Sequence, residues 1–104
     1  MTPADEFFRA VANVQRRRLL VRMLSHNPED ESKVYTGDRE TDEEELATLL
    51  IEMQHTHLPL LEEYGFIDWD RQNHEVSKGP EFDEIRPLLE MMVEHQGELP
   101  EGWL

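Results

Sequence analysis

The chain has 104 residues with 24 acidic and 10 basic side chains, which gives a formal net charge of -14, and it contains no cysteine. This length predicts a single domain with a modest core, and the lack of cysteine excludes disulfides, thiolate zinc sites and cysteine nucleophiles. No apolar run approaches the roughly 18 residues that span a bilayer, and the N-terminus lacks the features of a signal peptide, so we expect a cytoplasmic protein without membrane contacts.

The acidic composition has three interpretations: a disordered acidic tail, an acidic mimic of nucleic acid, or adaptation to a cytoplasm of very high salt. Regular apolar patterns argue against disorder, because disordered chains lack them. The acidic residues are spread over most of the sequence, which favours adaptation to salt, since a high net charge keeps a protein soluble.

Residues 4–25 carry apolar side chains at the i, i+3, i+4 spacing of one helix face, which predicts a single amphipathic helix. Thr2 or Asp5 is expected to cap its start, and Asn27-Pro28 to end it. The main basic cluster of the chain lies on this helix and consists of Arg16, Arg17, Arg18 and Arg22.

Residues 28–40, PEDESKVYTGDRE, lack a helical apolar period and are expected to form a loop, with room for a short strand at residues 33–36. The next residues, 41–64, show an apolar stripe that continues for about six helical turns. The stripe consists of Leu46, Leu49, Leu50, Met53, His57, Leu60, Leu61 and Tyr64. Thr41 and Glu44 have the spacing of a capping box, and Gly65 is placed to end the helix.

Pro59 interrupts this helix, because proline donates no backbone hydrogen bond and disfavours helical geometry at the preceding residue. One interpretation is a kink at residues 55–59, which would let the two halves of the helix face different partners. The other is a proline that the helix tolerates without consequence. The sequence does not decide between them.

After Gly65 the apolar period changes to that of strands. FIDWD and HEVSK are predicted to form a hairpin around the polar turn RQN, with Ile67 and Trp69 on one face. Residues 81–96 then form a last amphipathic helix, with Pro87 inside it or in its first turn.

The predicted elements give an α+β fold with the order helix, loop, long helix, hairpin, helix. One domain is expected over residues 1–96, followed by an irregular tail over residues 97–104. This element order is that of a winged-helix domain, and two sequence runs make the likeness more specific.

QRRRLLVRML at residues 15–24 and HTHLPLLEEYGFIDWD at residues 55–70 resemble small acidic winged helix-turn-helix regulators of salt-loving archaea, of the arsenic-repressor-like type. The resemblance covers roughly residues 7–78. It implies that the long helix is a recognition helix that runs into a wing. The positioning helix that normally precedes it is expected to be reduced or missing, because PEDESKVYTGDRE takes its place.

The resemblance and the charge pattern together suggest which side chains contact double-stranded DNA. The candidates are Arg16, Arg17, Arg18 and Arg22 for phosphates, Gln54, His55 and Thr56 for base edges, and Arg71 at the wing tip for a minor groove or a phosphate. Each group has a simpler alternative. The first arginines can pair with the acidic residues 29–45, residues 54–56 can be a solvated face, and the hairpin tip can be an ordinary polar turn.

Metal binding and catalysis have little support in the sequence. His55 and His57 are two residues apart and point to different helix faces, whereas helical metal ligands need a spacing of three or four. We expect no metal and no cofactor, and we expect His57 to be a hydrogen-bonded core or interface residue. No Ser or Thr lies in a nucleophile-elbow or phosphate-loop pattern, so an enzyme is the least supported class.

The last helix carries more apolar surface than a small core needs. In winged-helix repressors that this chain resembles, the last helix and the first one form the dimer. We therefore expect an isologous homodimer. Its interface is predicted at Ile85, Leu88, Leu89 and Met92, and Trp103 and Leu104 are expected either to add to this interface or to fray.

The leading functional hypothesis is a dimeric winged-helix regulator that binds operator DNA in a high-salt cytoplasm. The alternative is a winged-helix-derived module for protein-protein interaction or dimerisation that has no DNA partner, and an acidic decoy of DNA is a third possibility. A DNA binder needs the arginines on the same side as residues 54–56. An interaction module needs an exposed apolar patch, and a decoy has no positive face.

Overall fold

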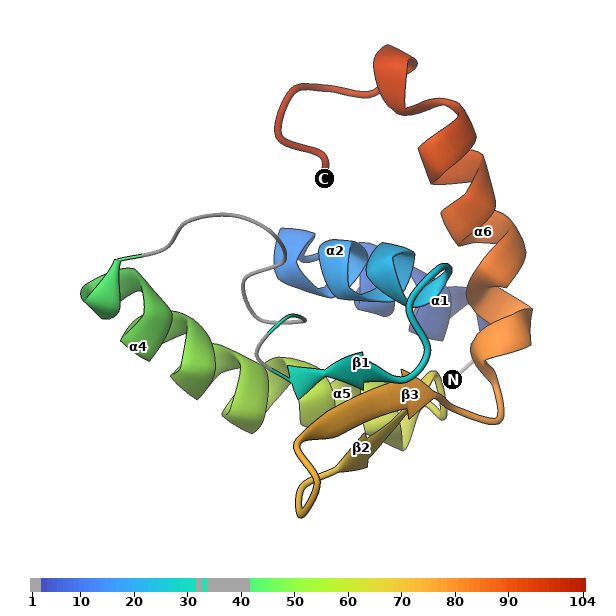
Figure 1. The fold of residues 1–104 in the computed structure, drawn as a ribbon. Helices are drawn as coiled ribbons and strands as arrows, with labels where there is room; N and C mark the ends of the chain where they lie inside the picture. Colours follow the sequence, from blue (N-terminus) through green and yellow to red (C-terminus); the bar gives the residue numbers. More distant parts are fainter. Residues whose placement is uncertain (1–2, 32, 34–41) are drawn as a thin grey trace.

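The computed structural model describes residues 3–31, 33 and 42–104. The described part consists of helices and a small three-stranded antiparallel sheet (Figure 1), so the α+β class that the sequence predicts is confirmed. None of the described helices is both long enough and apolar enough to cross a bilayer.

The N-terminal segment forms two helices, α1 (Pro3–Val11) and α2 (Val14–Met23), so the expectation of one helix over residues 4–25 is wrong. The break occurs because Asn13 has an extended backbone, with φ -110 and ψ 135, and caps α2. Its side-chain oxygen accepts hydrogen bonds from the backbone N–H groups of Gln15 at 2.8 Å and Arg16 at 3.4 Å.

The predicted caps of this segment need two corrections. Asp5 lies inside α1 and does not cap it, and Thr2 lies outside the described residues. The second helix ends at Met23, before the predicted stop at Asn27-Pro28.

The segment that was expected to be a loop begins with a strand, β1 (Glu29–Asp30). The backbones of Glu31 and Lys33 are helical, so Lys33 does not begin a strand as predicted. The rest of that predicted strand lies outside the described residues. The same holds for most of the segment that should replace the positioning helix, so the expectation that this helix is reduced or missing stays a prediction.

The long helix has three parts: α4 (Glu43–Glu52), the π-helical turn η1 (Met53–His57) and α5 (Leu58–Glu63). Asp42 is the N-cap, and its carboxylate accepts from the backbone N–H of Glu45 at 2.8 Å. The predicted capping box therefore begins one residue too early, and Thr41 itself lies outside the described residues.

The π-turn shows how the helix accommodates Pro59. In η1 the backbone N–H of Leu58 donates to the carbonyl of Met53, five residues back, directly before the residue that cannot donate. Of the two interpretations that the sequence left open, neither included this π-helical turn at Met53–His57. Because a π-turn holds one more residue than an α-turn, the apolar stripe shifts after His57, and Leu58 becomes fully buried although it lies outside the predicted stripe.

Gly65 ends α5 as predicted, with φ +79. The backbone N–H of Phe66 donates to the carbonyl of Leu61, and that of Gly65 to the carbonyl of Glu62, both at 3.0 Å. A Cβ at Gly65 would lie 2.9 Å from the Cγ of Glu81, which adds a steric reason for glycine at this position.

The predicted hairpin is confirmed as β2 (Ile67–Asp70) and β3 (Glu75–Lys78). In the sheet β3 lies between β2 and β1, with Trp69 and Glu29 both opposite Val76. As expected, Ile67 and Trp69 face inward, and Ile67 is fully buried.

The last helix, α6 (Phe82–Glu94), contains Pro87 in its interior. A 3-10 turn, η2 (Gln96–Glu98), follows, and the tail then returns toward α2, where Trp103 packs against the core (Figure 1).

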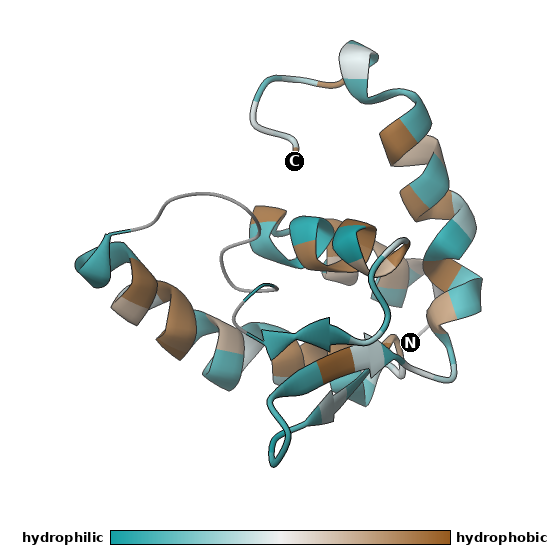
Figure 2. Ribbon diagram, viewed as in Figure 1, coloured by the Kyte–Doolittle hydropathy of each residue, from teal (hydrophilic) through white to brown (hydrophobic). Residues whose placement is uncertain are grey.

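The core is formed by apolar side chains from the helices and the hairpin. Its fully buried larger members are Leu19, Leu20, Met23, Met53, Leu58, Leu61, Phe66, Ile67, Val76, Phe82, Ile85 and Leu89. Figure 2 shows apolar positions on α2 and α6 and also along α4, where Ile51 is 63% exposed.

Candidate nucleic-acid interface

Arg16 closes the C-terminal end of α1. Its Nε–H is 3.2 Å from the carbonyl oxygens of Arg9 and Ala10, and its Nη2 donates to that of Arg9 at 2.7 Å. Its Nη1 donates to Nδ1 of His57 at 3.1 Å. The last carbonyls of a helix have no partner within the helix, so this side chain satisfies them. Burial lowers the pKa of Arg16.

Arg17 joins the same helix end to the C-terminal tail. Its Nη1 donates to the carbonyl of Val11 and its Nε to the carbonyl of Trp103, both at 2.8 Å. The guanidinium also lies over the Trp103 ring, 4.2 Å from the ring centroid, and Trp103 donates to the sulfur of Met92 at 3.4 Å. The pKa of Arg17 is lowered by burial. Trp103 is therefore fixed against its own chain.

Arg22 pairs with Glu29 of β1 at 2.8 Å, and both side chains are largely buried, at 17% and 12% exposure. Arg18 is half-buried and also has a partner. The pairing of arginines with the acidic residues 29–45 is thus confirmed for Arg22. The geometry conflicts with the predicted phosphate contacts of Arg16, Arg17 and Arg22, because their guanidinium groups are hydrogen-bonded inside the protein.

The other predicted DNA contacts lie together on the surface. Gln54 and His55 of the π-turn and Arg71 of the hairpin tip line a depression of about 320 Å³. Its remaining walls are Glu31, Trp69 and His74. Thr56 is exposed on the same π-turn but does not line the depression.

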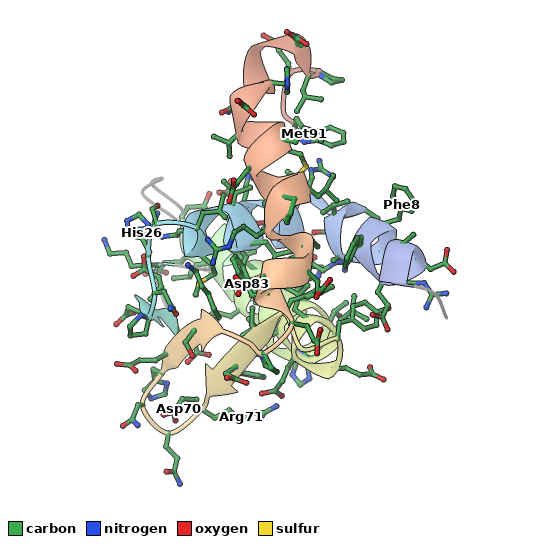
Figure 3. The ribbon with its side chains drawn as sticks, turned by 90° about the vertical axis from the view of Figure 1, so that its right-hand side faces the viewer. Phe8, His26, Asp70, Arg71, Asp83 and Met91 are labelled. Atoms are coloured by element: carbon green, nitrogen blue, oxygen red, sulfur yellow. The ribbon has the colours of Figure 1, made fainter. Side chains whose placement is uncertain are left out.

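Arg71 lies at the tip of the hairpin, in the lower part of the molecule in Figure 3. Its guanidinium is 4.0 Å from the ring centroid of Trp69, and its Nη2 is 3.7 Å from a carboxylate oxygen of Glu62. The other oxygen of Glu62 accepts from the backbone N–H of Trp69 at 3.3 Å. The Arg71 side chain is 60% exposed, so most of its donors face solvent.

The tip of the hairpin is closed by Asp70. Its Oδ1 accepts from the backbone N–H groups of Gln72 and Asn73, and its Oδ2 from the Asn73 side chain at 2.8 Å. The hydrogen bonds from Asn73 lower the pKa of Asp70. The turn therefore has a defined shape, which fixes the position of the adjacent Arg71.

His74, at the tip of the hairpin, contacts the segment that follows β1. The backbone of His74 has a positive φ of 54. The His74 Nδ1 is 3.1 Å from a carboxylate oxygen of Glu31, and the backbone N–H of Glu31 donates to the His74 carbonyl at 2.7 Å. Glu31 is only 5% exposed. Sequence reasoning missed both residues as parts of the site, because no local pattern relates positions 31 and 74. In contrast, the alternation along the strand did predict that Trp69 shares a face with Ile67.

His57 is a buried, hydrogen-bonded residue, as predicted, with 4% exposure. Burial lowers its pKa, Arg16 lowers it further, and Glu52 acts in the opposite direction. With Nδ1 accepting from Arg16, the neutral ring carries its proton on Nε2, which has no hydrogen-bond partner among the described residues. Over that same part of the chain, no group of three or more His, Asp or Glu side chains is arranged to hold a metal ion.

The predicted dimer interface needs a correction. Ile85 and Leu89 are fully buried in their own chain and Met92 is 6% exposed, because this stripe of α6 packs on the core. Only Leu88, which is half-buried, keeps accessible surface. The large apolar side chains that are exposed on α1 and α6 are instead Phe8 on α1, at 67%, and Met91 and Val93 on α6, at 56% and 43%. Figure 3 shows Phe8 on α1 at the right of the view and Met91 near the upper end of α6.

Comparison with known proteins gives one result. A family model described as a domain of unknown function, DUF7344, matches residues 8–77, from α1 to β3. Neither a curated protein nor a solved structure matches the chain significantly. The match includes the two helices with the arginines, the π-turn and the hairpin, and it covers more than half of the chain, which therefore belongs to the DUF7344 family.

Proposed function

We propose that this protein is a DNA-binding transcriptional regulator of the winged-helix type that acts as a homodimer. The observation that carries the proposal is the surface formed by η1 and the wing. Two segments that the sequence suggested separately, residues 54–56 and Arg71, lie together there, with the side chains of Gln54, His55 and Arg71 around one depression.

The arrangement of the elements supports this proposal. A long helix runs through Gly65 directly into a hairpin, as the resemblance to arsenic-repressor-like regulators requires, and β1 extends that hairpin into a sheet. In duplex binding, Gln54 is suited to pair with an adenine edge and Thr56 to touch a thymine methyl group. Arg71 is suited to a phosphate or a minor groove, because its donors face solvent.

The charges limit how such a domain can bind. Glu43, Glu44 and Glu45 form the first turn of α4, and the arginines of α2 are hydrogen-bonded within the protein. Few phosphate contacts are then available, and the slope of log K against log salt is expected to be about -1 to -2. A small slope is an advantage in a high-salt cytoplasm, the environment that we propose from the acidic composition.

For the homodimer we propose an interface that includes the exposed side chains of Phe8 and Met91 and the accessible part of Leu88. These residues lie on the first and the last long helix, which are the elements that the resemblance assigns to the dimer. Large apolar side chains that are exposed in this way are enriched at protein contacts.

The test is selection of bound sequences from a genomic fragment pool at molar potassium chloride. Wild type is compared with the double variant Gln54→Ala, Arg71→Ala and with Arg86→Ala, which removes an arginine of α6 that pairs with Asp83. A defined sequence, enriched by wild type and by Arg86→Ala but not by the double variant, is the expected result. Equal enrichment by all three proteins would place DNA on another surface.

A second candidate is an interaction or dimerisation module without DNA binding. It is favoured by the internal arginines of α2 and by the exposed Phe8 and Met91. Molar mass from light scattering distinguishes the two candidates in combination with the selection. Two results together support the interaction module. Wild type enriches no DNA sequence, and the Phe8→Ser, Met91→Ser variant is monomeric where wild type is a dimer. The matched control is Ile51→Ser, which removes an equally exposed apolar side chain from α4.

A further inference from the structure

The depression between η1 and the wing has the size and lining of a small-molecule site. Its volume of about 320 Å³ is at the lower end of the range for ligand pockets, roughly 300–1,000 Å³. It is lined by polar groups that come from three separate segments, namely Glu31, the π-turn and the hairpin. π-turns within helices often occur at functional sites, which makes this position notable.

The hydrogen-bonding capacity that faces the depression consists mainly of donors. The guanidinium of Arg71 has five N–H groups, and its ion pair with Glu62 is long, at 3.7 Å. His55 is exposed and makes no hydrogen bond or ion pair with any residue that the structure describes. A ligand that satisfies both groups must bring acceptors, and a carboxylate accepts well from Arg and His side chains.

The wall beside these donors is flat. The guanidinium of Arg71 lies over the ring of Trp69 at 4.0 Å, and the two groups form a stack at the edge of the depression. Planar groups pack well against an indole ring, because it offers a flat, weakly hydrated surface.

The one carboxylate in the lining does not dominate the charge of the site. The side chain of Glu31 is only 7% exposed, and one of its oxygens is 3.1 Å from Nδ1 of His74. The positively charged Arg71 is far more accessible, at 60%. Glu62, which pairs with Arg71, is 35% exposed, but Arg71 is the more accessible of the two, so the charge at the mouth of the depression favours an anionic ligand over a cationic one.

We propose that this depression binds a small planar organic acid. The carboxylate accepts hydrogen bonds from Arg71 and His55, and the planar part packs against the portion of Trp69 that lines the depression. This inference goes beyond the proposed function, since it concerns a free small molecule and requires no DNA. If the same surface also binds DNA, the acid and the duplex exclude each other.

The experiment is a calorimetric titration at fixed potassium chloride with three probes: benzoate, cyclohexanecarboxylate as the non-planar acid, and benzylamine as the planar cation. Benzoate is expected to bind in the millimolar range and at least about tenfold more tightly than either other probe, which corresponds to about 1.4 kcal/mol. No saturable binding of benzoate, or equal binding of one of the other probes, would overturn the proposal.

Variants locate the site. Arg71→Ala is expected to weaken benzoate binding at least tenfold. Arg86→Ala is a matched control, because Arg86 also lies over an aromatic ring, that of Phe82 at 5.3 Å, and pairs with a carboxylate, but belongs to α6. Unchanged affinity in Arg71→Ala, with circular dichroism confirming its fold, contradicts the assignment. Because the titrations contain no DNA, failure of this proposal is distinguishable from failure of the proposed function.

Discussion

Arg16 and Arg17 lie in the first turns of α2, and Arg71 lies at the tip of the hairpin. The two α2 arginines donate to backbone carbonyls of Arg9, Ala10, Val11 and Trp103 at distances between 2.7 and 3.2 Å. Arg71 donates to no backbone group among the described residues, and its 60% exposed side chain rests on Trp69. The clustered arginines thus support the fold, while the isolated arginine is available for a ligand.

The reason for the difference lies in the break between α1 and α2. When a helix ends, its last carbonyls need donors, and a charged, long side chain two turns away can reach them. The first helix ends at Val11 and Asn13 begins the second, so the arginines that follow Asn13 lie close to the end of the first helix. A basic run in a sequence is therefore weak evidence for nucleic-acid binding when a helix terminus lies next to it.

Arg16→Ala is expected to have the largest effect on stability, a loss of about 3 kcal/mol, because it leaves the carbonyls of Arg9 and Ala10 and Nδ1 of His57 without their donor. Urea denaturation measures this loss, and Arg16→Lys is expected to recover part of it. If Arg16→Ala and Arg71→Ala lower the free energy of unfolding by the same amount, the distinction between arginines that support the fold and the arginine that is available for a ligand is wrong.

The Arg17–Trp103 contact is expected to contribute about 1 kcal/mol beyond the separate effects of the two side chains. A double-mutant cycle with Arg17→Ala and Trp103→Ala measures this coupling by urea denaturation. Only the cation-π part is removed with the ring, because the Trp103 carbonyl remains as an acceptor. A coupling near zero would mean that the guanidinium and the ring do not stabilise each other, and that Arg17 contacts the tail effectively only through the Trp103 carbonyl.

Much of the fold could be predicted from local patterns. The hairpin, the stop at Gly65 and the last helix follow from strand alternation, from the need for positive φ and from helical period, and each of these is settled within a few residues of chain. The break at Asn13 was missed because apolar residues keep helical spacing across it, although Asn is a favoured N-cap.

The site was harder to predict, because its contacts are long-range. The partners of Arg16 and Arg17 include His57 and Trp103, which lie 41 and 86 residues away. The same holds for Glu31 and His74. The sequence left open whether Pro59 kinks the helix or is tolerated, and it did not predict the π-turn, which moves Leu58 into the core and places Gln54 and His55 beside the hairpin.

The Arg16–His57 pair adds a dependence on pH. The pKa of His57 is lowered from its ordinary value of 6.5 by burial and by Arg16, so below this value the unfolded chain takes up a proton more readily than the folded chain. Its contribution to stability is complete above pH 6.5 and is lost as pH falls toward the lowered pKa, with a slope of at most about 1.4 kcal/mol per pH unit.

The comparison that isolates this effect is the free energy of unfolding of wild type and His57→Asn between pH 7.5 and 5, values chosen to bracket roughly the ordinary imidazole range. The carboxylates and the other four histidines are present in both proteins, whereas only wild type has an imidazole at position 57. The variant is expected to lose less stability on acidification. Parallel profiles would mean that His57 is as accessible to protons in the folded protein as in the unfolded chain.

Arg71→Ala is expected to change stability by no more than about 0.5 kcal/mol, the smallest effect of the series, because an exposed side chain with a long ion pair contributes little. Urea denaturation measures it alongside Arg86→Ala. A loss above 1 kcal/mol would show that the stack on Trp69 holds the hairpin in place, and Arg71 would then belong with the supporting arginines. In that case weaker DNA or benzoate binding by Arg71→Ala would reflect a displaced hairpin. Arg71→Lys, which keeps the charge but not the planar guanidinium, would then separate the contribution of the charge from that of the contact with Trp69.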